Sequence, residues 1–262
     1  MIQHYDHRAA SVTVHEDNLH NAALSAIVTE DQHRDPDFFP TPQYWVSAEA
    51  KQLREYPGWT IGFRDIARAT DVRTFIAAIV PHASAGNTLP LVLQGASCSE
   101  GYANWAAQFV ANVSSLALDY IARQKVQTTH LNWYVVEQLP LIAPEKYALP
   151  LGNTTIGDFV RGEVLRLSYT AHDLDAFARD LGYDGAPFAW DEEDRRHRMA
   201  RLDALYFGLY GVSREEAAYV LDTFPIVREH DETQFNRYRT KELVLGYMNA
   251  LAAGDTTTVL AL

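Results

Sequence analysis

Two neighbouring apolar stretches decide the fold expected for this chain: TIGFRDIARA at residues 60–69 and RTFIAAIVPH at residues 73–82. Both are rich in β-branched and aromatic residues, which favour strands. The short gap between them contains Asp71 and suits a hairpin. A third strand is predicted over NTLPLVLQ at residues 87–94, where Pro90 indicates an edge position. Together these stretches predict a small antiparallel sheet.

The segments around this sheet have weaker patterns. The first 40 residues are expected to be irregular, and VSAEAKQLREY at residues 46–56 predicts a short helix. Residues 103–126 predict a longer helix with a break near Ser114. THLNWYVVEQLPLI at residues 129–142 then returns to an apolar pattern that predicts another strand.

The composition changes at APEKYALPLGNTT, residues 143–155, which has the proline, glycine and polar content of a linker. We therefore predict an α+β architecture with two regions. Residues 1–145 form a domain of mixed strands and helices, and residues 146–262 form a helical C-terminal region.

Several capping signals mark the helices of the C-terminal region. Thr155 is a predicted N-cap, and Ser213 with Glu216 has the spacing of a capping box. Residues 191–194 place four acids at the start of another helix, where they interact favourably with the helix dipole. The last helix, over residues 239–253, is expected to stop at Gly254. Four arginines lie along the helix that follows Asp191, three of them four positions after an acid, so this group is predicted to be a solvent-exposed face: Arg195, Arg196, Arg198 and Arg201.

The composition sets limits on the function. The chain has 262 residues, 47% of them hydrophobic and 21% charged, which is typical of a globular protein. It has no apolar run near the ~18 residues that span a bilayer, and its first residues are polar, so we expect a cytoplasmic protein with no membrane partner. Cys98 is the only cysteine, which excludes an internal disulfide and a thiolate zinc cage.

The net charge of −12 opposes binding to nucleic-acid phosphates, but it is unevenly distributed. Both flanks of the chain are acidic, whereas residues 58–170 contain equal numbers of acids and bases. A local basic face is therefore most plausible in this middle segment.

The arginines of the predicted hairpin are candidates for such a face. On a strand, Arg64 and Arg68 point to the same side, about 13 Å apart. The hairpin places Arg73 opposite Arg68, an arrangement that requires an anion or a carboxylate between them. That partner is either a nucleic-acid phosphate or guanine edge, or simply Asp65 or Asp71.

A second polar turn is predicted at residues 123–130, RQKVQTTH, between a helix and a strand. Its candidate DNA-contacting residues are Arg123, Lys125, Thr128, Thr129 and His130, which offer two cations and side chains that hydrogen-bond base edges. An ordinary surface turn is the alternative interpretation.

Two further patterns suggest metal sites. Asp37, Glu49 and Lys51 match the proline-aspartate and Glu-x-Lys pattern of metal-dependent nucleases, although the second half lies in a helical pattern rather than on a strand. The N-terminal group does not match the spacing of a closed ligand set, so we expect no metal there: His4, Asp6, His7, His15 and His20. Cys98 has no nucleophile motif around it and is interpreted as a structural or incidental thiol.

The chain also lacks the motifs of several enzymes. It contains no Pro-Pro, Asn-Pro or Gly-x-Gly sequence and no P-loop. A methyltransferase needs a glycine-rich turn for its cofactor and a proline-rich loop for the flipped adenine, so we expect no methyl transfer by this chain alone.

Several blocks of the sequence nevertheless resemble one family. These blocks are residues 63–81, 87–93, 118–144, 202–227 and 238–251, of which 63–81 and 118–144 are the most specific, together with MIQHYDHRAAS at residues 1–11. The five blocks resemble the C-terminal region of large Eco57I-like type II restriction–modification methylases and of related phage-defence methylases, and residues 1–11 resemble the segment after their methyltransferase core. The region also resembles the recognition domains of type I specificity subunits.

The resemblance implies a function for the chain. In that family an upstream Rossmann-like domain binds S-adenosylmethionine and methylates N6 of a flipped adenine, while the resembling region selects the DNA sequence. We therefore expect double-stranded DNA and a methyltransferase core as partners, no cofactor in this chain, and a catalytic domain outside it. DNA contacts are expected at residues 64–73 and 123–130. A metal-dependent nuclease and a structural or oligomerisation module are the alternatives.

Overall fold

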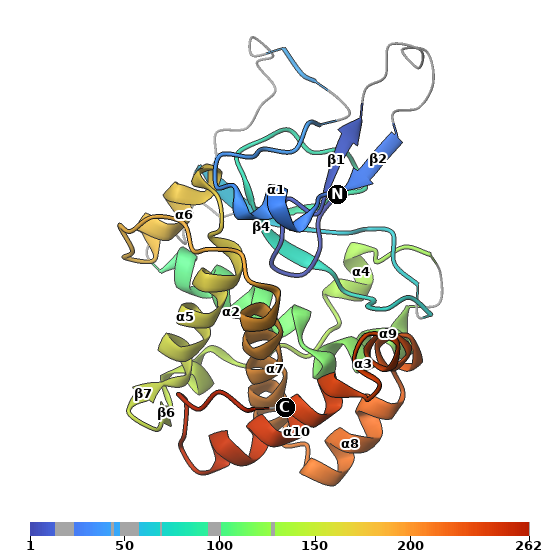
Figure 1. Ribbon diagram of the computed structural model, residues 1–262, viewed down its shortest axis with the longest axis vertical. Helices are drawn as coiled ribbons and strands as arrows, with labels where there is room; N and C mark the ends of the chain where they lie inside the picture. The colour runs from blue at the N-terminus through green and yellow to red at the C-terminus, as the bar shows by residue number, and fades with distance from the viewer. Residues whose placement is uncertain are drawn as a thin grey trace.

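The computed structural model describes residues 1–13, 24–42, 45–47, 58–68, 70–93, 101–126 and 129–261. The chain is an α+β protein in which small antiparallel sheets precede a helical C-terminal region (Figure 1). The predicted fold class is confirmed. Among the described residues, no helix is both long and apolar enough to cross a bilayer.

The central sheet has three antiparallel strands. β3 (Trp59–Phe63) lies between β4 (Ala77–Pro81) and β5 (Leu91–Val92). All of β3 is buried, which explains its continuous apolar sequence. The predicted pairing of the first two strands is confirmed, and β5 is an edge strand directly after Pro90, as expected for a proline that cannot donate to a ladder.

The connection between β3 and β4 is longer than predicted. It covers residues 64–76, and at its end the backbone N–H groups of Thr74 and the next residue donate to one carboxylate oxygen of Asp119, each at 2.8 Å. Arg68 and Arg73 both lie within this connection. The prediction that they face each other across a hairpin is wrong, because the β3–β4 ladder ends before it reaches them.

The predicted break near Ser114 is confirmed. α2 (Tyr102–Ser114) ends and α3 (Leu116–Lys125) begins around Ser115, whose backbone is extended. The Ser115 hydroxyl donates to the carbonyl of Asn112 and accepts from the N–H of Leu118. This serine therefore satisfies both helix ends that the break exposes.

The strand predicted over residues 129–142 is wrong. Only His130 forms a bridge, to Ile66, and the chain then turns into the short helix α4 (Trp133–Val136). The carbonyl of Asn132 accepts from two backbone N–H groups of this turn. A short apolar run does not distinguish a buried helical turn from a strand, and here the tertiary packing selected the helix.

The capping predictions of the C-terminal region are confirmed. Thr155 and Ser213 each accept from the backbone N–H three residues on, Ser213 and Glu216 form a capping box, and Gly254 ends the last helix with a positive φ of 76°. Asp191, for which only a place at the helix start was predicted, is also an N-cap, since its side chain accepts from the N–H of Asp194. The helices that follow these signals are α5 (Ile156–Ser168), α6 (Asp175–Asp180), α7 (Glu192–Leu209), α8 (Arg214–Asp222), α9 (Pro225–Phe235) and α10 (Arg239–Ala252). The 3₁₀ helix η3 (His172–Leu174) leads into α6.

The arginines of α7 are not simply a solvated face. Arg198 pairs with Asp194 as the spacing predicts, at 2.7 Å, but it also contacts Glu163 of α5. Arg195 and Arg201 are buried, and the guanidinium of Arg195 lies over the ring of Trp190. Three of the four arginines, Arg195, Arg198 and Arg201, therefore join α7 to neighbouring elements instead of only facing solvent.

The N-terminal residues are more ordered than the sequence predicted. Residues 5–8 are buried, and Arg8 has no exposed surface. They are followed by the antiparallel pair β1 (Ala10–Thr13) and β2 (Leu24–Ile27), and by the short helix α1 (Glu30–Arg34). Most of the helix predicted at residues 46–56 lies outside the described residues.

The segment predicted as a linker contains the 3₁₀ helix η2 (Pro144–Ala148) and the two-residue strands β6 (Pro150–Leu151) and β7 (Thr154–Thr155). Tyr147 of η2 is buried, and its hydroxyl lies 3.1 Å from that of Tyr206. One hydrophobic cluster includes residues on both sides of this segment. The predicted division between residues 145 and 146 is therefore not marked by a gap in the core.

Candidate functional site

The structure brings together parts of the two polar segments singled out in the sequence. The backbone N–H of Ala67 donates to the carbonyl of Thr129, and the N–H of Leu131 donates to the carbonyl of Asp65. Residues 64–68 therefore leave the β3–β4 ladder and lie beside residues 129–131. We call the face formed by residues 64–68 and 129–134 the 64/129 surface.

The 64/129 surface combines a cation with hydrogen-bonding and apolar groups. Its exposed residues are Ile66, Arg68, Thr129, His130, Asn132, Trp133 and Tyr134. Lys125, at the end of α3, is also exposed, and Arg64 is half-buried. Among the described residues, the side chains of Arg64, Arg68 and Lys125 make no ion pair. Their charge is therefore available to a ligand.

His130 is fixed by an acidic neighbour. Its Nδ1 lies 2.6 Å from a carboxylate oxygen of Asp65, and Asp65 is largely buried while the ring of His130 is half-exposed. This interaction orients the imidazole on the surface. It also gives the carboxylate of Asp65 a partner, so this surface does not contain an isolated negative charge at Asp65.

Arg73 is not on this surface. Its side chain is only 15% exposed, and one guanidinium nitrogen lies 3.6 Å from the buried carboxylate of Asp203. Burial raises the pKa of Asp203 to about 6, and the charge of Arg73 opposes that rise. The expectation that Arg73 contacts DNA does not agree with this arrangement, because its charge interacts with an acid inside the protein.

Arg123 likewise supports the connection instead of facing a ligand. Its Nε donates to Asp119 at 3.0 Å, and one terminal nitrogen donates to the carbonyls of Asp71 and Val72. The guanidinium also lies 4.2 Å from the ring centroid of Phe224, and the side chain is only 10% exposed. Arg123 therefore holds the 64–76 connection against α3.

Thr128 lies outside the described residues, so its predicted role stays a prediction. Trp133 and Tyr134, by contrast, were missed by the sequence reasoning, which assigned them to a strand. The aromatic pair in LNWYVVEQ directly after a polar turn was the available signal. Its exposure depends on the short helix that replaces that strand.

His4 lies close to this region but is not a free titrating group. Its Nε2 is 3.0 Å from the carbonyl of Phe75. Burial, together with the charges of Arg73 and Arg64, lowers the pKa of His4 to about 3. The imidazole is therefore neutral at physiological pH and donates to that carbonyl.

The other N-terminal candidates are also paired within the protein. His7 contacts both carboxylate oxygens of Asp173, and Asp6 contacts the Nε2 of His33. Across the described ranges, no group of three or more histidine, cysteine, aspartate or glutamate side chains has the geometry for a metal ion. His15 and His20 lie outside these ranges.

The nuclease pattern is only partly described. Asp37 is exposed, and its backbone N–H donates to the side chain of Asp35. Glu49, Lys51 and Cys98 lie outside the described residues, so their predicted roles stay predictions.

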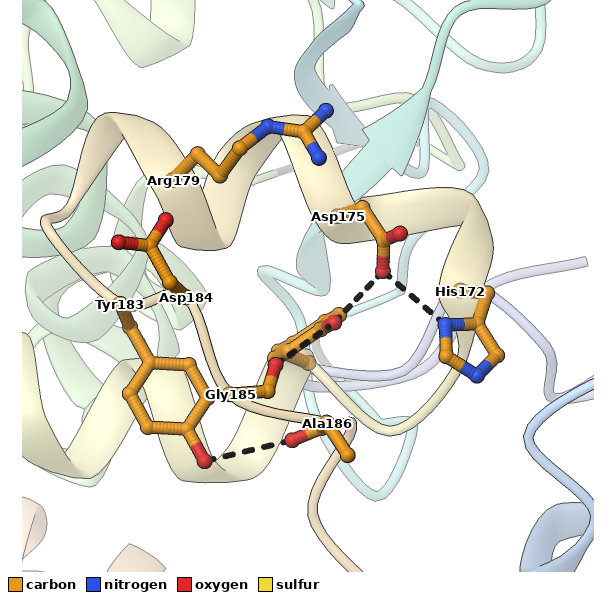
Figure 2. A pocket seen from close by; sticks show the side chains of 8 residues that line it. His172, Asp175, Arg179, Tyr183, Asp184, Gly185 and Ala186 are labelled. Carbon is orange, nitrogen blue, oxygen red and sulfur yellow. Dashed lines mark hydrogen bonds and ion pairs between the residues drawn. The ribbon is translucent and has the colours of Figure 1, made fainter.

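A separate cavity of about 290 Å³ lies beside α6 (Figure 2). The hydroxyl of Tyr169 donates to Asp175 at 2.6 Å and also lies 3.2 Å from the carbonyl oxygen of Gly185, and the Nδ1 of His172 contacts the same Asp175 oxygen. Tyr183 points toward the carbonyl of Ala186, to which its hydroxyl donates.

The hydrogen bonds of this cavity favour a structural role for its central groups. Burial, reinforced by Asp175, raises the pKa of Tyr169, and the hydrogen bond from Tyr169 lowers the pKa of Asp175. Tyr169 therefore stays protonated while Asp175 stays charged, and together they hold residues 183–186 near α6. The described lining contains no serine, threonine or cysteine nucleophile. In Figure 1, α6 and α4 lie on opposite sides of the molecule, so this cavity is separate from the 64/129 surface.

No family model, curated protein or solved structure matches the chain.

Proposed function

We propose that this chain is the DNA-recognition module of a restriction–modification adenine N6-methyltransferase, and that it contacts double-stranded DNA through the 64/129 surface. The observation that carries the proposal is the pairing of residues 64–68 with residues 129–131. This pairing places unpaired cations, hydrogen-bonding side chains and exposed aromatic rings together. Phosphate contacts need the cations, and base-edge contacts need the polar side chains.

The resemblance gives this surface its interpretation. The two most specific resembling blocks, residues 63–81 and 118–144, contain the residues that form the surface and those that support it. Asp119 accepts from the backbone of the connection, and Arg123 donates to it. These internal bonds make the two blocks one rigid unit, which is what a recognition surface requires.

The electrostatics limit how tightly the chain binds alone. Among the described residues of this face, Arg64 and Arg68 are the cations without an ion pair, and Lys125 at the end of α3 is a further exposed cation, whereas the whole chain has a net charge of −12. We therefore expect weak binding to DNA that decreases steeply with salt, because the favourable contribution comes mainly from phosphate neutralisation.

Methyl transfer is assigned to a separate methyltransferase core, which binds S-adenosylmethionine and acts with this module in cis or in trans. The missing glycine-rich and proline-rich loops support this division. Such an assembly works on DNA in the cytoplasm. The purified chain is expected neither to bind S-adenosylmethionine in a calorimetric titration nor to methylate DNA, and saturable cofactor binding would contradict the assignment.

The test of DNA binding is a fluorescence-anisotropy titration of the whole chain with labelled duplexes at several salt concentrations. Arg68→Ala and Lys125→Ala are each expected to weaken binding and to flatten the salt dependence by about one unit if they contact phosphates. If Arg68 reads guanine, its loss costs roughly 1–3 kcal/mol on the target sequence only. Arg161→Ala, which removes a 38% exposed cation from α5, is the matched control and is expected to bind like the parent.

Two outcomes would contradict the proposal. The first is parent-like binding by both variants when the methyltransferase core is supplied. The second is plasmid cleavage in magnesium or manganese that Glu49→Ala abolishes, since that result would favour the metal-dependent nuclease.

A further inference from the structure

α4 presents two aromatic side chains to solvent. Trp133 is 45% exposed and Tyr134 is 59% exposed, although they are neighbours on a helix of one turn. Large aromatic side chains are usually buried or used in interfaces, because leaving their rings in water forfeits much apolar burial. Both rings belong to the 64/129 surface, which also carries Arg64 and Arg68, and two exposed rings there indicate a ligand with an apolar, planar part.

The position of these rings is determined by the core below them. The ring of Trp133 meets the buried ring of Phe63 edge-to-face, with centroids 5.1 Å apart. Val135 is buried, so it anchors the opposite side of the helix. The side-chain amide of Gln138 donates to the carbonyl of Tyr134 at 2.7 Å and closes the turn. The pair is therefore held on a fixed support and is not a chance exposure at a chain end.

The charges around α4 identify the ligand class. Phe63, whose ring Trp133 meets, is followed directly by Arg64, and the N–H of Ala67, next to Arg68, donates to the carbonyl of Thr129 shortly before α4 begins at Trp133. A ligand that stacks on the aromatic rings and also pairs with the cations combines planar groups with negative charge. A nucleotide whose base is not covered by stacked neighbours has this combination.

We propose that Trp133 and Tyr134 form a stacking platform for an unpaired nucleobase, while Arg64 and Arg68 contact the adjacent phosphates. This inference rests on the proposed DNA-recognition function and adds to it a preference for DNA with an extrahelical or unpaired base. In a fully paired duplex the faces of each base are covered by its neighbours, so the rings gain little contact there. Disrupting one base step exposes a face to Tyr134.

The test uses the whole chain and two labelled duplexes of the same sequence. One is fully paired, and the other has a single bulged 2-aminopurine. The parent is expected to bind the bulged duplex about tenfold more tightly, and stacking is expected to change the 2-aminopurine emission on binding. Tyr134→Ala should remove most of this preference, whereas Tyr134→Phe should retain it, because stacking needs the ring and not the hydroxyl.

Two variants control for folding and for nonspecific aromatic effects. Tyr219→Ala removes a ring that is 67% exposed on α8, and it should leave the preference unchanged. Trp133→Ala should reduce the preference as well, but it also loses the contact with Phe63, so its thermal unfolding is measured alongside. Tyr134 makes no ring contact with a described residue, which makes Tyr134→Ala the more decisive variant.

The outcomes separate this inference from the proposed function. Equal affinity of the parent for both duplexes, or an undiminished preference in folded Tyr134→Ala, would overturn the stacking platform while leaving duplex binding intact. Failure of the parent to bind either duplex would overturn the proposed function and the platform with it. A Tyr134-dependent complex with a protein in place of DNA would also overturn both.

Discussion

Arg8 is a fully buried cation whose partners are mostly backbone carbonyls. Its guanidinium donates to the carbonyls of His33, Asp35, Phe38 and Thr170, at 2.7–3.2 Å. It therefore ties the N-terminal segment to α1 and to the chain after α5. An uncharged side chain in its place leaves those buried acceptors without donors, which is the costly case for hydrogen bonding.

We predict that Arg8→Met lowers the free energy of unfolding by about 3 kcal/mol or more. Urea unfolding followed by circular dichroism measures the change. Arg34→Ala is the control, because Arg34 is 56% exposed and its ion pairs with Glu30 and Asp31 contribute roughly 0–1 kcal/mol. Equal effects of the two variants would contradict the role assigned to Arg8.

His4 makes the stability depend on pH. In the unfolded chain it takes up a proton below its ordinary pKa of 6.5, whereas in the folded protein the pKa is lowered to about 3. The unfolded state therefore binds more protons between these values, and stability falls as the pH falls from about 6.5 toward 3. One such group contributes at most about 1.4 kcal/mol per pH unit, and partial exposure reduces this.

His4→Gln is expected to reduce the loss of unfolding free energy at acidic pH, because glutamine retains an N–H donor for the Phe75 carbonyl but does not titrate. Unfolding free energies measured at pH 4, 5, 6 and 7 for the parent and the variant test this point. An unchanged slope in the variant would show that the acid sensitivity arises elsewhere. His82→Gln, which replaces another histidine of the chain, is the comparison variant.

The 64–76 connection depends on α3 for its shape. One oxygen of Asp119 accepts from the backbone N–H groups of Thr74 and Phe75, and the other accepts from Arg123. A single buried carboxylate therefore substitutes for the strand partner that this segment lacks. Asp119 thereby fixes the β4 end of the 64–76 connection, and Arg68 lies elsewhere on the same connection.

We predict that Asp119→Ala destabilises the protein by about 3–5 kcal/mol, since it leaves two buried N–H groups and a mostly buried guanidinium without their acceptor. Hydrogen exchange at Thr74 and Phe75 should accelerate with it. Asp158→Ala on α5 removes an exposed carboxylate and should cost less than about 1 kcal/mol. Unchanged exchange at the two amides in Asp119→Ala would refute the proposed support.

The two predicted regions of the molecule share their hydrophobic core. α2 packs on α5, and the hydroxyl of Tyr206 donates to the carbonyl of Gln108 across the predicted boundary. Division of the chain after residue 145 would expose apolar faces on both pieces. We expect residues 1–145 alone to show no cooperative thermal transition, and a mixture with residues 146–262 to regain one. A cooperative transition in the isolated fragment would instead support the predicted boundary.

The sequence was sufficient where a structural signal is local. The caps at Thr155 and Ser213, the stop at Gly254 and the break near Ser114 depend on a side chain bonding its own backbone within a few residues, or on the freedom of glycine to adopt a positive φ. The pairing of β3 with β4 also followed from composition. These features need no distant partner, so a short stretch of sequence determines them.

Only the tertiary structure decided which cations are available to a ligand. Arg68 and Arg123 have the same character in the sequence, yet Arg68 faces solvent while Arg123 is bound to Asp119 and to the backbone of a segment some 50 residues away. The helix at Trp133 was likewise selected by packing on Phe63 and not by its apolar run. Composition and periodicity show which side chains could contact a ligand, but burial and contacts with distant residues decide which of them are exposed and able to do so.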